Sequence, residues 1–163
     1  MDIRPCTESD LDRLLTQWQV AGNVHEAHFA GQSAGATTYL VAWCVDEPLG
    51  SAVIQWSGCV GENARQAFPQ AVEINHLQVR EEYRGRGIGT ALIAAAEQLC
   101  ASHSKTLVTV GVADENPEAE KLYHKLGYRR SGVSDVSRYV WVAPDGTRQQ
   151  AEEHDLLLLK NLG

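Results

Sequence analysis

The distribution of apolar and polar residues along the chain predicts both strands and helices. Short runs rich in β-branched and aromatic residues indicate strands, whereas apolar residues spaced three and four apart indicate helices. Strands are expected over residues 2–5, 39–45, 51–56, 71–79, 106–112, 133–142 and 154–159. Helices are expected between Thr7 and Gly22 and over residues 23–29, 87–102 and 118–126. Such a mixture is typical of an α/β or α+β domain.

Local signals mark the ends of two helices. The stretch from Thr7 to Asp10 resembles a capping box, in which a side chain three residues after the cap returns to the cap amide. Gly22 is expected to end that helix. Asn116 and Pro117 are typical of a helix cap and first turn, and Gly127 of a helix end.

The segments between the elements differ in character. Residues 46–50 contain Pro48 and Gly50 and predict the turn of a β-hairpin. Residues 31–36 are mostly small and suggest a linker. Residues 58–70 are polar and irregular, so we expect a loop that either binds a ligand or is merely mobile.

Composition narrows the range of functions. A chain of 163 residues and 17.9 kDa suits one domain over residues 1–163. The net charge of -7 argues against a nucleic-acid partner and agrees with a cationic, amine-bearing substrate. The four cysteines form no C-x-x-C motif, which predicts reduced thiols and a cytoplasmic protein. We expect no leader and no membrane partner, because no charged-then-apolar start and no long apolar run is present.

The junction between the strand at 71–79 and the helix at 87–102 predicts an anion site. Three glycines, Gly85, Gly87 and Gly89, stand where the helix begins, with two arginines among them. The first amides of a helix lack internal acceptors, and the helix dipole adds partial positive charge there. The spacing is neither the dinucleotide fingerprint G-x-G-x-x-G nor a Walker A loop. The alternative is a glycine-rich turn with solvated arginines.

One further cluster, from His25 to His28, could suggest a metal. A zincin motif needs its second histidine one position later, and no third ligand is evident. We therefore expect no metal site and interpret these histidines as surface or substrate-side residues.

Two motifs resemble those of the GNAT superfamily of acyl-CoA-dependent N-acyltransferases. The stretch from Arg84 to Gly89 matches the pattern R/Q-x-x-G-x-G/A, and Asn116 to Tyr128 is similar to N-x-x-A-x-x-L-Y-x-x-x-G-Y/F. The order and separation of the two motifs also agree. The resemblance implies the GNAT fold: a mixed, mostly antiparallel sheet of about seven strands, flanked by about four helices, in which the fourth and fifth strands splay apart.

The resemblance also implies acetyl-CoA as cosubstrate. Its pantetheine arm would lie along the fourth strand at Leu77, Gln78 and Val79, with the Val79 amide as the oxyanion donor. An Asn116 side-chain contact to the arm is carried over too. The residues expected to bind the pyrophosphate are Arg84, Gly85, Arg86, Gly87, Ile88, Gly89 and Thr90.

Two side chains are candidates for proton transfer. The motif position of Tyr123 implies a general acid for the leaving thiolate, although a packed aromatic is the alternative. Glu73 enters an apolar strand, where burial would raise its pKa toward that of a useful general base for the amine. A surface carboxylate is the alternative for Glu73. His76 is a rival base, yet strand alternation predicts that it faces away from Glu73.

The expected function is transfer of an acetyl group from acetyl-CoA to a primary amine of a small molecule, peptide or protein. A non-catalytic acyl-CoA-binding module on the same fold remains an alternative, as does a domain that binds some other phosphate ligand. No motif in the sequence identifies the acceptor. Its specificity is expected from residues 22–36, 58–70 and 131–139. Homodimers through the C-terminal strands are common among proteins that resemble this one.

Overall fold

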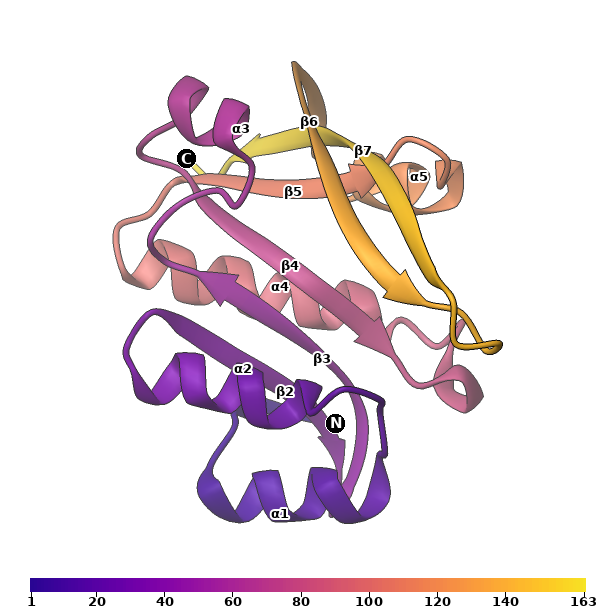
Figure 1. Cartoon of the computed structure of the whole chain (residues 1–163). Coiled ribbons are helices and arrows are strands. Elements are labelled where there is room, and N and C mark those ends of the chain that lie inside the picture. Colours follow the sequence, from indigo (N-terminus) through magenta and orange to yellow (C-terminus); the bar gives the residue numbers. More distant parts are fainter.

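A computed structural model describes all 163 residues of the chain (Figure 1). Seven strands form one sheet in the order β1-β2-β3-β4-β5-β7-β6. Only β4 and β5 run parallel; every other neighbouring pair is antiparallel. This confirms the expected mixed, mostly antiparallel sheet. The strands are β1 Asp2–Pro5, β2 Thr37–Cys44, β3 Glu47–Gln55, β4 Val72–Val79, β5 Leu107–Ala113, β6 Arg129–Val142 and β7 Arg148–Asn161.

Five α-helices flank the sheet, together with a short 3-10 helix, η1, at Glu81–Tyr83. The helix that the sequence patterns missed is α3, which lies within the segment expected to be an irregular loop. Figure 1 shows α1 and α2 in front of the lower strands and α4 behind the sheet. The helices are α1 Glu8–Gln17, α2 Val24–Ser33, α3 Glu62–Ala67, α4 Ile88–Ser102 and α5 Pro117–Lys125.

Strand β2 shows how the two faces of the sheet are covered. Leu40 and Ala42 belong to the large apolar cluster that contains the buried face of α4. Tyr39, Val41 and Trp43 belong to a second cluster with residues of α1. Successive side chains of a strand point to opposite faces, so an unbroken apolar run can fill two cores at once.

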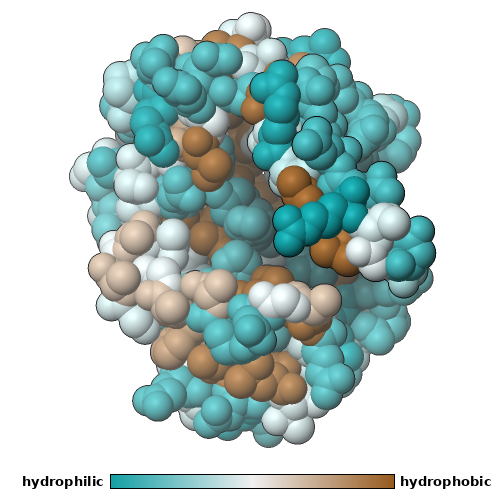
Figure 2. All heavy atoms as spheres, in the orientation of Figure 1, coloured by the Kyte–Doolittle hydropathy of each residue, from teal (hydrophilic) through white to brown (hydrophobic).

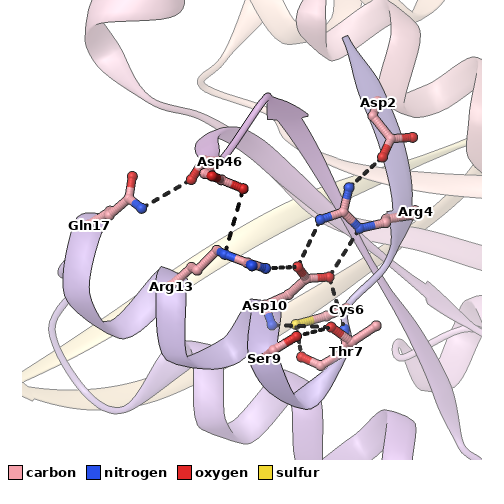
Figure 3. A network of polar contacts seen from close by, with 9 residues as sticks. All are labelled: Asp2, Arg4, Cys6, Thr7, Ser9, Asp10, Arg13, Gln17 and Asp46. Atoms are coloured by element: carbon pink, nitrogen blue, oxygen red, sulfur yellow. Dashed lines mark hydrogen bonds and ion pairs between the residues drawn. The ribbon is translucent and has the colours of Figure 1, made fainter.

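The start of α1 is fixed by an ionic network, shown in Figure 3. Thr7 and Asp10 form the predicted capping box. The Asp10 carboxylate also accepts hydrogen bonds from Arg4 Nη2 at 2.8 Å and from Arg13 at 3.1 Å. Burial alone would raise the pKa of Asp10, but the hydrogen bonds from Arg4 and Thr7 hold it below its usual value. This network ties β1 to α1.

Strands β4 and β5 are splayed, as the family resemblance implies. They pair only at Val72 with Val108 and at Glu73 with Thr109. Beyond this point β4 continues its pairing with β3, while β5 continues with β7 along its whole length. Figure 1 shows the two strands diverging toward the end of β4. The edge of β4 that faces β5 is therefore open over residues 75–79.

A bulge in β4 corrects the predicted orientation of His76. The pairing of β3 with β4 shifts between Ser51 and Val53, and His76 has a φ of 52°. A bulge re-aims the side chains around it, so strict alternation fails at this point. Glu73, Asn75 and His76 consequently line one cavity. The expectation that His76 faces away from Glu73 was wrong.

Several element boundaries differ from the sequence pattern. Helix α1 ends at Gln17, well before Gly22, and α2 runs on to Ser33, into the expected linker. The turn between β2 and β3 is at Val45 and Asp46 rather than around Pro48. Gly50 lies inside β3, where a Cβ would come within 2.7 Å of the Gln78 carbonyl oxygen. That glycine serves close strand approach rather than a turn.

The last two strands are longer than expected. Strands β6 and β7 have 14 residues each, whereas β5 pairs only with Asp155–Asn161 of β7. The remainder of β6 and β7 pair only with each other and project as a hairpin away from β5, toward the C-terminal end of β4 (Figure 1). None of the helices is both long and apolar enough to cross a membrane.

Candidate active site

The loop between β4 and α4 presents free backbone amides. Gly85 and Gly87 have φ angles of 78° and 80°, a left-handed conformation that glycine adopts without strain. The amides of residues 85–87 donate no hydrogen bond to a backbone carbonyl. Residues 88–90 form the first turn of α4, where amides lack helical acceptors. This run of donors at the positive end of a helix dipole suits a phosphate group.

The two arginines of the motif have different surroundings. Arg84 Nε donates to the Val79 carbonyl at 3.1 Å, which ties the loop to the end of β4. The Arg86 guanidinium lies 5.5 Å from the centre of the Tyr83 ring and is exposed to solvent. Ile88 is buried, so only its amide is available to a ligand. The loop therefore combines exposed positive charge with backbone amide donors.

The open edge of β4 lies next to this loop. Leu77 and Val79 carry side-chain carbons 3.8 Å from the position that a Cβ on Gly89 would take. The amide of Arg80 donates to the Leu49 carbonyl in β3 at 2.9 Å. Because successive amides of a strand point to opposite edges, the Val79 amide points toward the splay. The Val79 amide is therefore next to the loop whose amides suit a phosphate group.

The second motif spans helix α5, with Asn116 as its N-cap and Tyr123 within the helix. Asn116 caps the helix, because its Oδ1 accepts a hydrogen bond from the Ala119 amide at 3.2 Å. Only its Nδ2 is left to donate to a ligand. Tyr123 is 8 % exposed, packs edge-on against Tyr128, and makes no hydrogen bond through its hydroxyl. Burial raises the pKa of Tyr123 to about 12, so the phenol keeps its proton at neutral pH.

Glu73 lies at the point where β4 and β5 separate. It is 6 % exposed, and burial raises the pKa of its carboxyl group above 4.5. Asn75 Nδ2 donates to one carboxylate oxygen at 2.8 Å, and the Val60 amide approaches the other at 3.4 Å. A buried carboxylate with a raised pKa is suited to accept a proton.

Glu73 opens onto a cavity of about 560 Å³ between β4, β5, α3 and the β6–β7 hairpin. Figure 2, drawn in the orientation of Figure 1, shows hydrophilic residues around α3 and hydrophobic atoms deeper between these elements. Two of the three segments expected to face the acceptor, 58–70 and 131–139, contribute to the lining. The residues that line it are Val60, Gly61, Glu62, Asn63, Ala64, Glu73, Asn75, His76, Gly111, Asp135, Val136, Ser137, Asp155, Leu156 and Leu157.

The sequence patterns did not single out Asp135 and Asp155. Each is a carboxylate inside a stretch predicted as a strand, which was the only signal available. Their register makes them cross-strand partners in β6 and β7. Burial is the main reason why the pKa of Glu73 is raised. The hydrogen bonds from Asn75 and Val60 lower this pKa, whereas the charges of Asp155 and Asp135 raise it further.

His28 is not part of the cavity lining but lies next to His76, which is. The rings of His28 and His76 are 4.7 Å apart, and burial lowers the pKa of both, that of His28 to about 4. His25 is buried and bonded to Tyr39 and to the Trp18 carbonyl, each at 2.7 Å. It is a core residue rather than the surface residue expected from the sequence. The structure holds no cluster of three metal-ligating side chains.

Glu73 and Tyr123 lie on different sides of the open stretch of β4. Glu73 faces the cavity under the hairpin, whereas Tyr123 belongs to the apolar cluster that contains α4 and is absent from the cavity lining. The anion loop and the β4 edge lie together at the α4 end. The predicted residues therefore form two groups. Glu73 lies at the cavity, whereas Tyr123 and the anion loop lie on the side of α4, and the opening between β4 and β5 separates them.

Two relatives match parts of the sequence. An uncharacterized N-acetyltransferase of Methanocaldococcus jannaschii is 36% identical over 64 residues, which are 39% of this chain and 28% of that protein. Human N-acetylaspartate synthetase is 34% identical over 81 residues, or 50% of this chain and 26% of its own length. The matches thus span less than a third of these two relatives.

A solved structure has the same fold over almost its whole length. The GNAT family acetyltransferase of Elizabethkingia anophelis, determined with acetyl-CoA bound, has a TM-score of 0.63 at 18% identity. The match covers 99% of this chain and 97% of that one. The pattern of the Acetyltransferase (GNAT) family matches residues 4–128, which include both motifs. The chain belongs to the acetyltransferase (GNAT) family.

Proposed function

We propose that this protein is an N-acetyltransferase that transfers an acetyl group from acetyl-CoA to a primary amine of a small molecule, peptide or protein. The observation that carries the proposal is the open edge of β4 beside a loop of free amides. Acetyl-CoA, when bound, supplies an acetyl thioester activated toward amines. The amides of residues 85–90 and the side chains of Arg84 and Arg86 would hold its phosphates.

The chain offers a group for each remaining requirement of the reaction. The backbone of Leu77, Gln78 and Val79 would align the pantetheine arm as an added strand, with Asn116 Nδ2 as a further donor. The Val79 amide would donate to the carbonyl oxygen as negative charge develops on it. These are positioning and electrostatic roles that fixed backbone donors fill well.

Two side chains would move the protons. Glu73 would accept the proton that the acceptor amine loses, directly or through a water molecule, since an amine with a pKa near 10.4 is mostly protonated at neutral pH. Tyr123 Oη would give a proton to the thiolate as the carbon–sulfur bond breaks, and would regain it from water. Their positions on opposite sides of the β4 opening suit these separate tasks.

The proposal is tested by free-thiol release from acetyl-CoA with polyamine, aminoglycoside and peptide amines. We expect turnover with one class, and a fall of roughly 100-fold in kcat for Tyr123→Phe. CoA at a hundred times its dissociation constant should stabilise both proteins by about 2.7 kcal/mol. Tyr139→Phe makes the same change on β6 outside the cavity and keeps the aromatic ring, so it is the matched control and should keep wild-type turnover.

The outcomes separate the alternatives. CoA binding without turnover on any amine would contradict the enzyme proposal and favour a non-catalytic acyl-CoA-binding module. Absence of stabilisation by CoA would favour another phosphate ligand at the loop. Unchanged turnover in Tyr123→Phe would remove only Tyr123 from the mechanism.

We further propose that the protein is cytoplasmic and forms homodimers. Its four cysteines are free, and three of them are buried, which supports a reducing compartment. Strand β6 is the last strand of the sheet and leaves one edge unpaired. Its outer half exposes Val136, Tyr139, Val140, Trp141 and Val142. A second copy of β6, antiparallel across a two-fold axis, would cover the edge and this apolar surface together.

A further inference from the structure

The cavity at Glu73 contains an excess of negative charge. Four carboxylates line it, from Glu62, Glu73, Asp135 and Asp155, and no lysine or arginine does. None of Glu73, Asp135 and Asp155 forms an ion pair with a cationic side chain elsewhere in the chain. Glu73 is buried and Asp135 and Asp155 are half-buried, and a charge removed from water is costly unless an opposite charge balances it. No lysine or arginine of the protein balances the negative charge of this cavity, so a bound cation would do so.

Two of these carboxylates are placed against each other. Asp135 and Asp155 are directly opposite in the ladder between β6 and β7. Like charges at such positions destabilise a sheet. Asp135 has a structural use, because its oxygens accept hydrogen bonds from the Asn63 amide at 2.9 Å and the Ala64 amide at 3.1 Å. The side-chain carboxylate of Asp155 accepts no hydrogen bond from another side chain or from the backbone, and burial and neighbouring aspartates raise its pKa.

A second observation points to a missing donor at the other end of the cavity. Asn75 Oδ1 is buried and has no hydrogen-bond partner, while Nδ2 of the same side chain donates to Glu73. A buried acceptor without a partner costs free energy unless a ligand satisfies it. Glu73 itself is 94 % buried, since only 6 % of its surface is exposed. An ammonium group carries three donors and could bond both side chains.

Glu73 and Asp155 are offset from each other along the strands of the sheet. In the ladders of β5, Glu73 is opposite Thr109 and Asp155 is opposite Ala113. The four residues from Thr109 to Ala113 correspond to an offset of roughly 13 Å between backbone positions along β5. Between them the lining is small or apolar, at Gly111 and Leu156. This sequence of charge, apolar wall and charge matches a carbon chain with a cationic group at each end.

We propose that the acceptor is a small dication or polycation, in which two amines are separated by a flexible carbon chain. One amine lies at Glu73 and Asn75, where it is acetylated, and the second lies at Asp155. The proposal rests on the acetyltransferase function proposed above. A cavity of about 560 Å³ is the size of a small-molecule site. The same charge disfavours an acceptor with a carboxylate, such as an acidic amino acid.

Three compounds with six carbon atoms each test the inference. Hexamethylenediamine, hexylamine and ε-aminocaproate share one primary amine and differ at the far end, which is a cation, a methyl group or a carboxylate. Their binding to the CoA-saturated protein is measured by titration calorimetry. We expect the diamine to bind most tightly and the amino acid most weakly. Asp155→Asn should weaken diamine binding about tenfold and leave hexylamine unchanged.

Glu152→Gln is the matched control, because it removes the same charge from the same strand outside the cavity. It should leave the binding of all three compounds unchanged. Equal affinity of wild type for the diamine and hexylamine would overturn the proposal, and this comparison needs no variant. So would an unchanged diamine affinity in Asp155→Asn, or no binding of the diamine at all.

Thiol release with the same compounds separates this inference from the proposed function. Tight diamine binding without turnover would support the site but contradict the acetyltransferase proposal. Equal turnover of all three compounds would support the enzyme and overturn the dication site. A diamine preference in kcat/KM that falls in Asp155→Asn supports both.

Discussion

Glu73 shows how the role of one residue depends on its surroundings. In the sequence it is a carboxylate at the start of an apolar strand. In the fold it is buried where two strands separate, with Asn75 as its hydrogen-bond donor. Burial in this position raises its pKa, and Asp155 and Asp135 raise it further. A carboxylate whose pKa is raised in this way is a stronger base than a solvent-exposed carboxylate.

The pH profile of the reaction tests this role. If Glu73 accepts the proton, kcat/KM should fall on the acid side with a midpoint above 4.5, the ordinary pKa of a glutamate. Glu73→Gln should lose this limb and reduce kcat roughly 100-fold or more. Glu62→Gln, which removes an exposed carboxylate from the same cavity, should keep the limb. Survival of the limb in Glu73→Gln would assign it to another group.

Stability gives a second measure of the same pKa. The folded-state pKa of Glu73 is raised, so the folded protein binds this proton more tightly than the unfolded chain. The associated stabilisation is present at low pH and is lost as pH rises through the folded pKa. Glu73→Gln stays neutral, so its stability relative to wild type should increase between about pH 4 and about pH 8. Denaturant unfolding of both proteins at the two pH values would show this difference.

Among the elements, α3 depends most on tertiary contacts. It has six residues, and its N-cap, Gly61, has no side chain to bond the first amides. Asp135 from β6 supplies those bonds, and Asn63 Nδ2 returns one to the Ser134 carbonyl at 3.0 Å. A Cβ on Gly61 would come within 2.1 Å of the Asp135 carboxylate. The helix is thus held against the hairpin and forms one wall of the cavity.

We therefore expect Asp135→Ala to loosen α3 selectively. Loss of an N-cap costs about 1 kcal/mol. Amide hydrogen exchange over Glu62–Ala67 should become faster, while exchange in α4 should stay unchanged. Asp145→Ala, which removes an aspartate that bonds only Thr147 in the hairpin turn, is the control and should leave α3 protected. Equal exchange in all three proteins would show that α3 does not need this cap.

At the scale of the whole molecule, the β6–β7 hairpin stands out. Its outer half pairs with no third strand, and a two-stranded ribbon is marginally stable by itself. Five of the nine exposed large hydrophobic residues in the chain lie between Val136 and Val142. This concentration at a free sheet edge supports the proposed homodimer.

Sedimentation equilibrium tests the dimer. We expect wild type to have twice the mass of the 17.9 kDa chain and Val140→Glu to be a monomer, because the new charge would be buried against apolar groups. Leu15→Glu makes the same type of change at an exposed apolar residue on α1 and should remain a dimer. A monomeric wild type at tens of micromolar would contradict the proposal.

The sequence determined the order and type of most elements. The β-branched apolar run at residues 106–112 favours a buried strand, and Thr7 and Asn116 cap helices through hydrogen bonds to residues three positions later in the sequence. The glycine loop was predicted for the same reason, since its free amides and positive φ angles follow from the residues themselves. The family motifs implied the splay that the strand pairing confirms.

Only the tertiary structure decided what meets in space. The bulge at His76 depends on the register between two strands, and a one-residue shift reverses the faces of all that follows. Asp135 and Asp155 are 20 positions apart in number but become direct partners through the hairpin, and α3 exists because Asp135 reaches it. Local sequence sets propensities and caps, whereas long-range register sets which charges share a cavity. The composition of the acceptor cavity is therefore a property of the fold.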